Sequence, residues 1–165
     1  MINAPSLVER PEQAYVAIRR KVTIPFTPII DQVMPEVAGW LQAKGVVRFG
    51  PAIFRYNLID MPRLDVEMGF APAEAIAGDE RVRSNSLPAG RYATLTHRGH
   101  YDKLIEATGV LIGWAREVGI TWDSTIDARG EHFVSRFELY LNGPVDTPDP
   151  EKWETQIFIK IRVDG

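Results

Sequence analysis

The sequence predicts an α+β fold in which two pseudo-symmetric strand-helix-strand-strand repeats form one antiparallel sheet with two helices on one face. Two observations support this prediction. The expected helices end similarly, with Gly39-Trp40-Leu41 in the first half and Gly113-Trp114-Ala115 in the second. Later in each half, Ile53-Phe54-Arg55-Tyr56 corresponds to Phe137-Glu138-Leu139-Tyr140. Because neither half can cover its own apolar sheet face, we expect the repeats to share a core around a pseudo-two-fold axis.

The length of 165 residues fits a single domain that spans residues 1–165. Within this domain, the first repeat covers about residues 12–72. The second repeat covers about residues 79–164. The order of predicted elements is the same in both repeats.

The first repeat begins with a strand over residues 12–23, where apolar and polar side chains alternate. Apolar residues then recur at spacings of three and four over residues 27–44, which predicts an amphipathic helix. Pro35 lies inside that pattern and either kinks the helix or begins its main part. Two strands follow, over residues 52–58 and 63–71.

The second repeat follows the same order. A strand that ends before Pro88 leads into a second strand over residues 91–97. A helix is expected from about residue 101 to 118. The chain closes with a hairpin whose strands cover residues 133–142 and 153–163, since β-branched and aromatic residues dominate both segments.

Side chains alternate between the two faces of a sheet, so each strand carries an apolar row and a mixed row. Ile157, Ile159 and Ile161 form the apolar row of the last strand, which we expect to pack against a helix. Sheet twist should curve the opposite face into a ligand groove, because so much aromatic area is unusual on a solvated surface. The side chains assigned to this groove are Phe54, Tyr56, Tyr92, Glu138, Tyr140, Gln156 and Phe158.

Glu138 is the one carboxylate among these groove residues, and two interpretations of it remain open. It is either a solvated glutamate paired with Arg136 or Lys160, or an acid inside an aromatic-lined cleft. In a cleft, partial desolvation would raise its pKa and strengthen its attraction for a cation.

The composition excludes several classes of function. The chain has 22 acidic and 19 basic residues, a net charge of −3 and no cationic cluster, so direct nucleic-acid binding is not expected. Cysteine is absent, which excludes disulfides and thiolate metal sites. His97 and His100 lie at a strand end, where helical spacing does not apply, and no metal site is predicted. Nucleotide-binding motifs are missing, and no cofactor is predicted.

The N-terminus has neither a basic segment nor an apolar segment of the kind found in signal peptides. No stretch of the sequence is long and apolar enough to span a bilayer. We therefore expect a cytoplasmic protein without a membrane partner.

Several short motifs occur along the chain: Gly50-Pro51-Ala52, Asp65-Val66-Glu67, Pro88-Ala89-Gly90-Arg91-Tyr92-Ala93, Leu111-x-x-Trp114, Phe137-Glu138-Leu139-Tyr140-Leu141-Asn142 and Trp153-Glu154-Thr155-Gln156-Ile157-Phe158-Ile159. In their order and spacing, over nearly the whole chain, they resemble the GyrI-like small-molecule-binding family. This family includes the DNA gyrase inhibitor protein and the effector-binding domains of AraC- and MerR-type regulators that sense multidrug cations. Some stand-alone members hydrolyse cyclopropane-bearing DNA-alkylating natural products.

The resemblance implies roles for individual residues. Glu138 matches the buried pocket glutamate of the family, and Trp153 matches an aromatic residue that stacks on the ligand. The positions that line the same cavity are matched by Tyr92, Tyr101 and Leu104. Gln156 departs from the pattern, because related proteins often have a second glutamate there. Glu154 is the nearest acid on that strand, at a displacement of roughly 7 Å.

These observations favour a stand-alone binding protein that takes up lipophilic, cationic or aromatic compounds for drug or toxin sensing or sequestration, with a link to transcription regulation. One alternative is a hydrolase of cyclopropane-type toxins, in which Glu138 acts as general base with help from Tyr92 or Tyr140. Another is an interaction protein whose partner is gyrase or a regulator. Because the sequence has no helix-turn-helix, a regulatory role would need such a partner chain.

Overall fold

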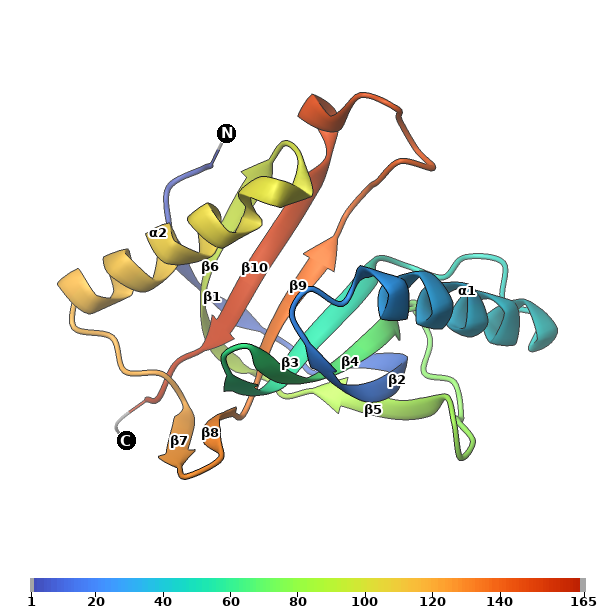
Figure 1. The fold of residues 1–165 in the computed structure, drawn as a ribbon, viewed down its shortest axis with the longest axis horizontal. Coiled ribbons are helices and arrows are strands. Elements are labelled where there is room, and N and C mark those ends of the chain that lie inside the picture. Colours follow the sequence, from blue (N-terminus) through green and yellow to red (C-terminus); the bar gives the residue numbers. More distant parts are fainter. Residues whose placement is uncertain (1, 164–165) are drawn as a thin grey trace.

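The computed structural model describes residues 2–163 of the chain. Within these residues the fold consists of two helices and ten strands (Figure 1). Two short 3-10 turns, η1 and η2, precede α2 and the last strand. In chain order the elements are β1 (Ser6–Arg10), β2 (Gln13–Thr23), α1 (Thr27–Ala43), β3 (Ala52–Asp60), β4 (Arg63–Phe70), β5 (Arg83–Leu87), β6 (Gly90–Arg98), η1 (Tyr101–Lys103), α2 (Leu104–Glu117), β7 (Ser124–Asp127), β8 (Gly130–Phe133), β9 (Arg136–Tyr140), η2 (Pro150–Lys152) and β10 (Glu154–Lys160).

The strands form one antiparallel sheet, and the predicted fold class is confirmed. The strand order is β1-β6-β10-β9-β3-β4-β2-β5, with the β7–β8 hairpin attached to β3 through β8. The two helices lie on the same face of the sheet, α1 over the half that contains β2 and β4, and α2 over the half that contains β6 (Figure 1). None of the helices in residues 2–163 is long and apolar enough to cross a membrane.

The pseudo-two-fold axis passes between β3 and β9, the two central strands. Phe54 of β3 is paired directly with Glu138 of β9. These two residues occupy equivalent positions in the repeated segments, and so do Tyr56 and Tyr140. Because an axis relates each residue to its counterpart, the pairing of Phe54 with Glu138 places the axis between them.

The two repeats exchange their edge strands. β1 precedes β2 in the chain but pairs with β6, and β5 precedes β6 but pairs with β2. Each repeat therefore completes the sheet of the other half. This exchange ties the halves together in addition to the central β3–β9 pairing.

The face that carries the helices, called the helix face below, has two apolar clusters. Val33, Val37 and Leu41 of α1 pack over β2 and β4. In the other half, Ala107 and Leu111 of α2 pack over β6 and β10. Each cluster follows from an apolar stripe with helical spacing that meets the apolar row of a strand.

The opposite face, called the inner face below, has its own core. The sheet curls into a half-barrel, so that side chains from its two ends meet without help from a helix. Tyr15 of β2 and Tyr92 of β6 belong to the same buried cluster as Phe137 of β9. The inner face therefore encloses packed aromatic residues at its centre.

Some local predictions differ from the structure. The N-terminal strand β1 and the β7–β8 hairpin were not expected. The strand predicted over residues 133–142 is interrupted, because β8 ends at Phe133 and pairs with β3, whereas β9 begins at Arg136. Pro35 lies in the interior of α1. It does not begin the helix, because Pro28 occupies the first turn.

Candidate functional site

Glu138 lies at the centre of the helix face. It stands on β9, which runs between α1 and α2 (Figure 1). Its neighbours across the sheet are Phe54 of β3 and Ile157 of β10. Only 8% of Glu138 is exposed to solvent. The interpretation as a solvated surface glutamate is therefore wrong.

Two tyrosines hold one oxygen of this carboxylate. The hydroxyl groups of Tyr56 and Tyr140 both donate hydrogen bonds to Glu138 Oε1, each at 2.7 Å. These tyrosines occupy equivalent positions in the two repeats, so they approach the axis from both sides. Within residues 2–163, no hydrogen bond reaches the second oxygen, Oε2. That oxygen can therefore accept a further hydrogen bond.

Burial dominates the electrostatics of the site. It raises the pKa of Glu138, whereas the two tyrosine hydrogen bonds and the nearby charge of Arg136 oppose that rise. Burial, together with the adjacent carboxylate, also raises the pKa of Tyr56 and of Tyr140 well above the ordinary value. Both phenols therefore stay protonated and act as donors at neutral pH. Arg136 is itself desolvated, which lowers the pKa of its guanidinium.

Aromatic rings surround the carboxylate on the helix face. The ring of Tyr140 lies 5.1 Å from that of Phe54 and 5.4 Å from that of Tyr101. Tyr101, in η1, stacks on Trp153 with a centroid distance of 4.8 Å. His100 adds a further ring, 5.5 Å from Trp153. A nearly buried carboxylate with an open oxygen, beside a continuous aromatic surface, has the chemistry to hold an organic cation.

The structure does not bring all the predicted residues to this site. Phe54, Tyr56, Glu138, Tyr140, Tyr101 and Trp153 lie together, and Leu104 is half-buried at the start of α2 beside η1. The prediction that they occupy the face without helices is wrong, because Glu138 and its neighbours are on the helix face.

Tyr92, Gln156 and Phe158 lie on the inner face, away from Glu138. Gln156 is paired with Leu139, and Ile157 is the residue opposite Glu138. Since side chains alternate along β10, Gln156 and Phe158 must point away from the carboxylate. The sequence showed two rows on each strand, but not which rows of neighbouring strands share a face.

This arrangement bears on the hydrolase alternative. Tyr92 is fully buried, and its hydroxyl donates to the carbonyl oxygen of Pro88 at 2.7 Å, so it does not assist Glu138. Gln156 and Glu154 share the inner-face row of β10. Neither can therefore supply a second catalytic group beside Glu138.

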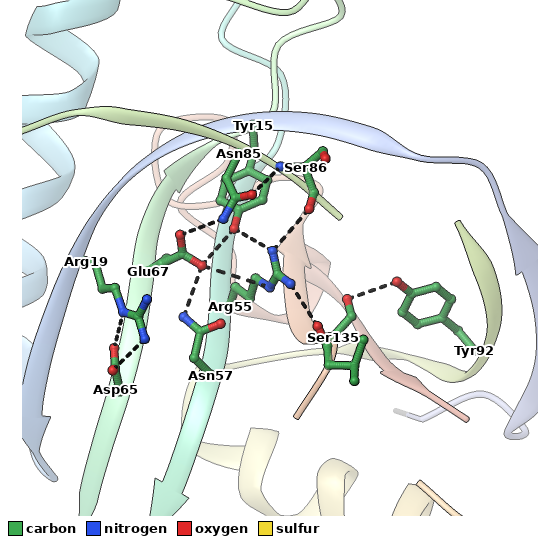
Figure 2. A network of polar contacts seen from close by, with 11 residues as sticks. Tyr15, Arg19, Arg55, Asn57, Asp65, Glu67, Asn85, Ser86, Tyr92 and Ser135 are labelled. Atoms are coloured by element: carbon green, nitrogen blue, oxygen red, sulfur yellow. Dashed lines mark hydrogen bonds and ion pairs between the residues drawn. The ribbon is translucent and has the colours of Figure 1, made fainter. Parts of the chain in front are cut away.

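The inner face holds a polar network that the sequence analysis did not find (Figure 2). Arg55 donates to the hydroxyl of Tyr15 at 2.8 Å and to the carbonyl oxygen of Val134 at 2.8 Å. Tyr15 donates in turn to Glu67 at 2.7 Å. The available signal was Arg55 itself, a charged residue in the same row as the apolar Ile53. Figure 2 shows these side chains pointing toward one another between β2, β3 and β4.

Comparison with protein families gives a match over residues 3–162 to the GyrI-like small molecule binding domain. The chain belongs to the GyrI-like family. A comparison with curated protein sequences found no match.

Solved structures agree with this GyrI-like fold. The crystal structure of the EcmrR C-terminal domain is similar, with a TM-score of 0.71, 21% identity and 98% of both chains covered. EcmrR in a complex with DNA has a TM-score of 0.73 and 21% identity, and the match covers 98% of this chain but 58% of the EcmrR chain. The chain thus spans a little over half the length of that relative.

Two further GyrI-like folds differ in what is described for them. SAV2435 bound to tetraphenylphosphonium has a TM-score of 0.64 and 14% identity, with 97% of this chain and 94% of SAV2435 covered. A hydrolase from Listeria innocua has a TM-score of 0.59 and 14% identity, with 96% of this chain and 91% of the hydrolase covered. At these identities the similarity concerns the fold.

Proposed function

We propose that this GyrI-like domain binds lipophilic organic cations on its helix face, between α1 and α2. Glu138 supplies the negative charge, and its free Oε2 faces the ligand. The rings of Tyr101, Tyr140 and Trp153 supply stacking and cation-π contacts. Sensing or sequestration of a toxic cation is the role that this chemistry would serve.

The single observation that carries the proposal is the state of the Glu138 carboxylate. Both of its hydrogen bonds go to Oε1, and no ion pair neutralises it within the described part of the chain. A desolvated carboxylate without an ion-pair partner gains more from a cation than an exposed one does. The adjacent aromatic surface excludes small hydrated ions and favours cations with apolar substituents.

The similar structures are consistent with this ligand class. SAV2435 was solved with tetraphenylphosphonium, a lipophilic cation, and shares the fold. EcmrR was solved with DNA, and its C-terminal domain matches 98% of this chain. We also propose a cytoplasmic location and a link to transcription through gyrase or a regulator. The resemblance of the sequence motifs to the GyrI-like family supports that link.

The test is a titration with two ions of the same shape and opposite charge. Tetraphenylphosphonium should quench tryptophan fluorescence, because Trp153 lies in the aromatic surface, and calorimetry should give its affinity. Tetraphenylborate should bind at least about tenfold more weakly, since it cannot pair with a carboxylate. Equal affinity for both ions would show that binding depends on apolar area alone.

Glu138→Gln is the variant that isolates the charge. It keeps the size of the side chain and can still accept from Tyr56 and Tyr140, and it should weaken tetraphenylphosphonium binding by about tenfold or more. Glu154→Gln is the matched control, because Glu154 lies on the inner-face row and its side chain is 40% exposed. If Glu138→Gln binds the cation as well as Glu154→Gln does, the proposal fails.

A further inference from the structure

A depression lies on the inner face, on the side of the sheet away from Glu138. It is bounded by β1, β6 and β10 and has a volume of about 480 Å³. Phe158, of which 4% is exposed, forms part of its wall. Gln156, which the helix-face site does not use, also lines it. The volume is in the range of pockets that take small organic ligands.

Arg10 brings a positive charge to this depression. Its guanidinium carbon lies 4.3 Å from the ring centroid of Phe158 and 5.3 Å from that of Phe137. One nitrogen donates to the side-chain oxygen of Gln13. No carboxylate of residues 2–163 forms an ion pair with Arg10. Partial burial lowers the pKa of Arg10, as expected for a cation that lacks a counter-charge.

Neutral hydrogen-bonding groups line the depression beside this cation. Thr96 is paired with Gln156 across β6 and β10, and Thr94 is paired with Ser6 across β6 and β1. In the described chain, the side chains of these four residues make no hydrogen bond with the rest of the protein. The single acid at the rim, Glu9, is exposed and pairs with Arg91 at 2.8 Å.

The corresponding surface of the first repeat is different. A depression of about 630 Å³ lies there beside β2, β4 and β5. Two of its acids are already paired, because Arg19 forms two hydrogen bonds of 2.8 Å to Asp65, and Glu67 belongs to the Arg55 network. That depression has a mixed lining of acidic and basic side chains, whereas the β1–β6–β10 depression has the half-buried Arg10 beside neutral groups.

We propose that the β1–β6–β10 depression binds a small organic monocarboxylate. The free edge of the Arg10 guanidinium pairs with the carboxylate, and Thr94, Thr96 and Gln156 complete its hydrogen bonds. The wall formed by Phe158 contacts the apolar part of the ligand. One guanidinium with neutral donors matches a single negative charge better than it matches a phosphate dianion. This site is separate from the cation site of the helix face.

The test uses benzoate as the probe, with full-length protein at constant ionic strength. Benzoate should bind with a dissociation constant of about 1 mM or tighter and shift the backbone amide signals of β6 and β10 on the inner-face row. Benzyl alcohol, a neutral analogue, and inorganic phosphate should bind at least about tenfold more weakly. No binding of benzoate at about 10 mM, or preferential binding of phosphate, would overturn the assignment.

Variants of Arg10 and Gln156 test whether the guanidinium of Arg10 binds the carboxylate of benzoate. Arg10→Gln should weaken benzoate binding by about tenfold or more and leave tetraphenylphosphonium binding unchanged, whereas Arg10→Lys should restore part of the benzoate affinity. Gln156→Leu gives a second measurement if Arg10→Gln does not fold, and should also weaken benzoate binding. If both variants bind benzoate as the wild type does, or if the shifted amides surround Glu138, the proposal is wrong.

Discussion

The molecule contains two nearly buried glutamates of equal exposure, Glu138 on the helix face and Glu67 on the inner face. Each is 8% exposed, and each accepts a hydrogen bond of 2.7 Å from a tyrosine hydroxyl. Their other partners differ. Glu67 also accepts from Asn57 at 3.0 Å and Asn85 at 3.4 Å. Arg55 lies 3.9 Å from it, as a counter-charge.

The difference separates a structural carboxylate from one that is available to a ligand. Both oxygens of Glu67 are engaged, and the network joins β2, β3, β4 and β5 (Figure 2). Glu138 has two donors on one oxygen and none on the other within residues 2–163. Burial alone does not distinguish the two residues. The number of donors on each oxygen and the presence of a counter-charge do.

The largest expected effect comes from breaking the inner-face network. Arg55→Met should lower the free energy of unfolding by about 3–5 kcal/mol, because it leaves Glu67 buried without its counter-charge and removes a contact to Val134. Urea denaturation followed by circular dichroism measures this loss. Glu138→Gln is the comparison variant and should change stability far less. Similar losses in the two variants would contradict the structural role assigned to Glu67.

The second prediction concerns pH, and it depends on the raised pKa of Glu138. A group with a folded-state pKa above its unfolded-state value stabilises the fold fully at pH values below the unfolded pKa. That contribution is lost as the pH rises through the folded-state pKa. As the pH rises from the unfolded-state pKa to the folded-state pKa, the free energy of unfolding of the wild type should therefore fall relative to that of Glu138→Gln. Over the same pH range the affinity of the wild type for tetraphenylphosphonium should increase, because the carboxylate becomes charged.

Tyr56→Phe sharpens this prediction. It removes one of the two hydrogen bonds that stabilise the charged form, so the pKa of Glu138 should rise further. The increase in cation affinity should then occur at higher pH, with a loss of about tenfold at neutral pH. Tyr140→Phe should behave in the same way, because Tyr140 donates to the same oxygen at the same distance. Calorimetric titration across pH measures the cation affinity of both variants. An unchanged pH profile would contradict the role assigned to the two tyrosine hydrogen bonds.

The smallest effect is expected at the edge of the inner-face network. Arg19 is 59% exposed at its side chain, although it pairs with the nearly buried Asp65. Arg19→Gln should cost no more than about 1 kcal/mol of stability, since solvent screens exposed ion pairs. The cost should shrink further in high salt. Thermal denaturation at two salt concentrations measures this, and a loss as large as that of Arg55→Met would contradict the comparison.

The repeats, both helices and the central strands could be predicted from the sequence, because periodicity and turn residues are local signals. The contacts of Glu138 with Tyr140 and Tyr56 also follow from such signals, since Tyr140 is two residues along the same strand and Tyr56 occupies the equivalent position in the first repeat. The face could not be predicted. Whether Gln156 or Ile157 stands beside Glu138 depends on the register between β9 and β10, which pairing of distant segments decides.

Two other features could not be predicted from local patterns in the sequence. β1 is short, and its place beside β6 depends on residues 80 or more positions away in the chain. The break between β8 and β9 occurs within a segment of continuous strand propensity. Ser135, between β8 and β9, is buried, with 1% exposed. β8 pairs with the end of β3 and does not continue directly into β9. Only the three-dimensional arrangement of the sheet fixes this break.

The position of Glu138 on the pseudo-two-fold axis has a consequence for symmetry. A homodimer made from one repeat could build the same sheet, but it would place identical residues opposite each other where Phe54 now faces Glu138. Two glutamates there would repel one another as directly opposed like charges in a sheet, and two phenylalanines would leave the centre without a charge. A single chain that holds both repeats escapes this restriction. Covalent duplication is what allows a single carboxylate to occupy the middle of an otherwise symmetric molecule.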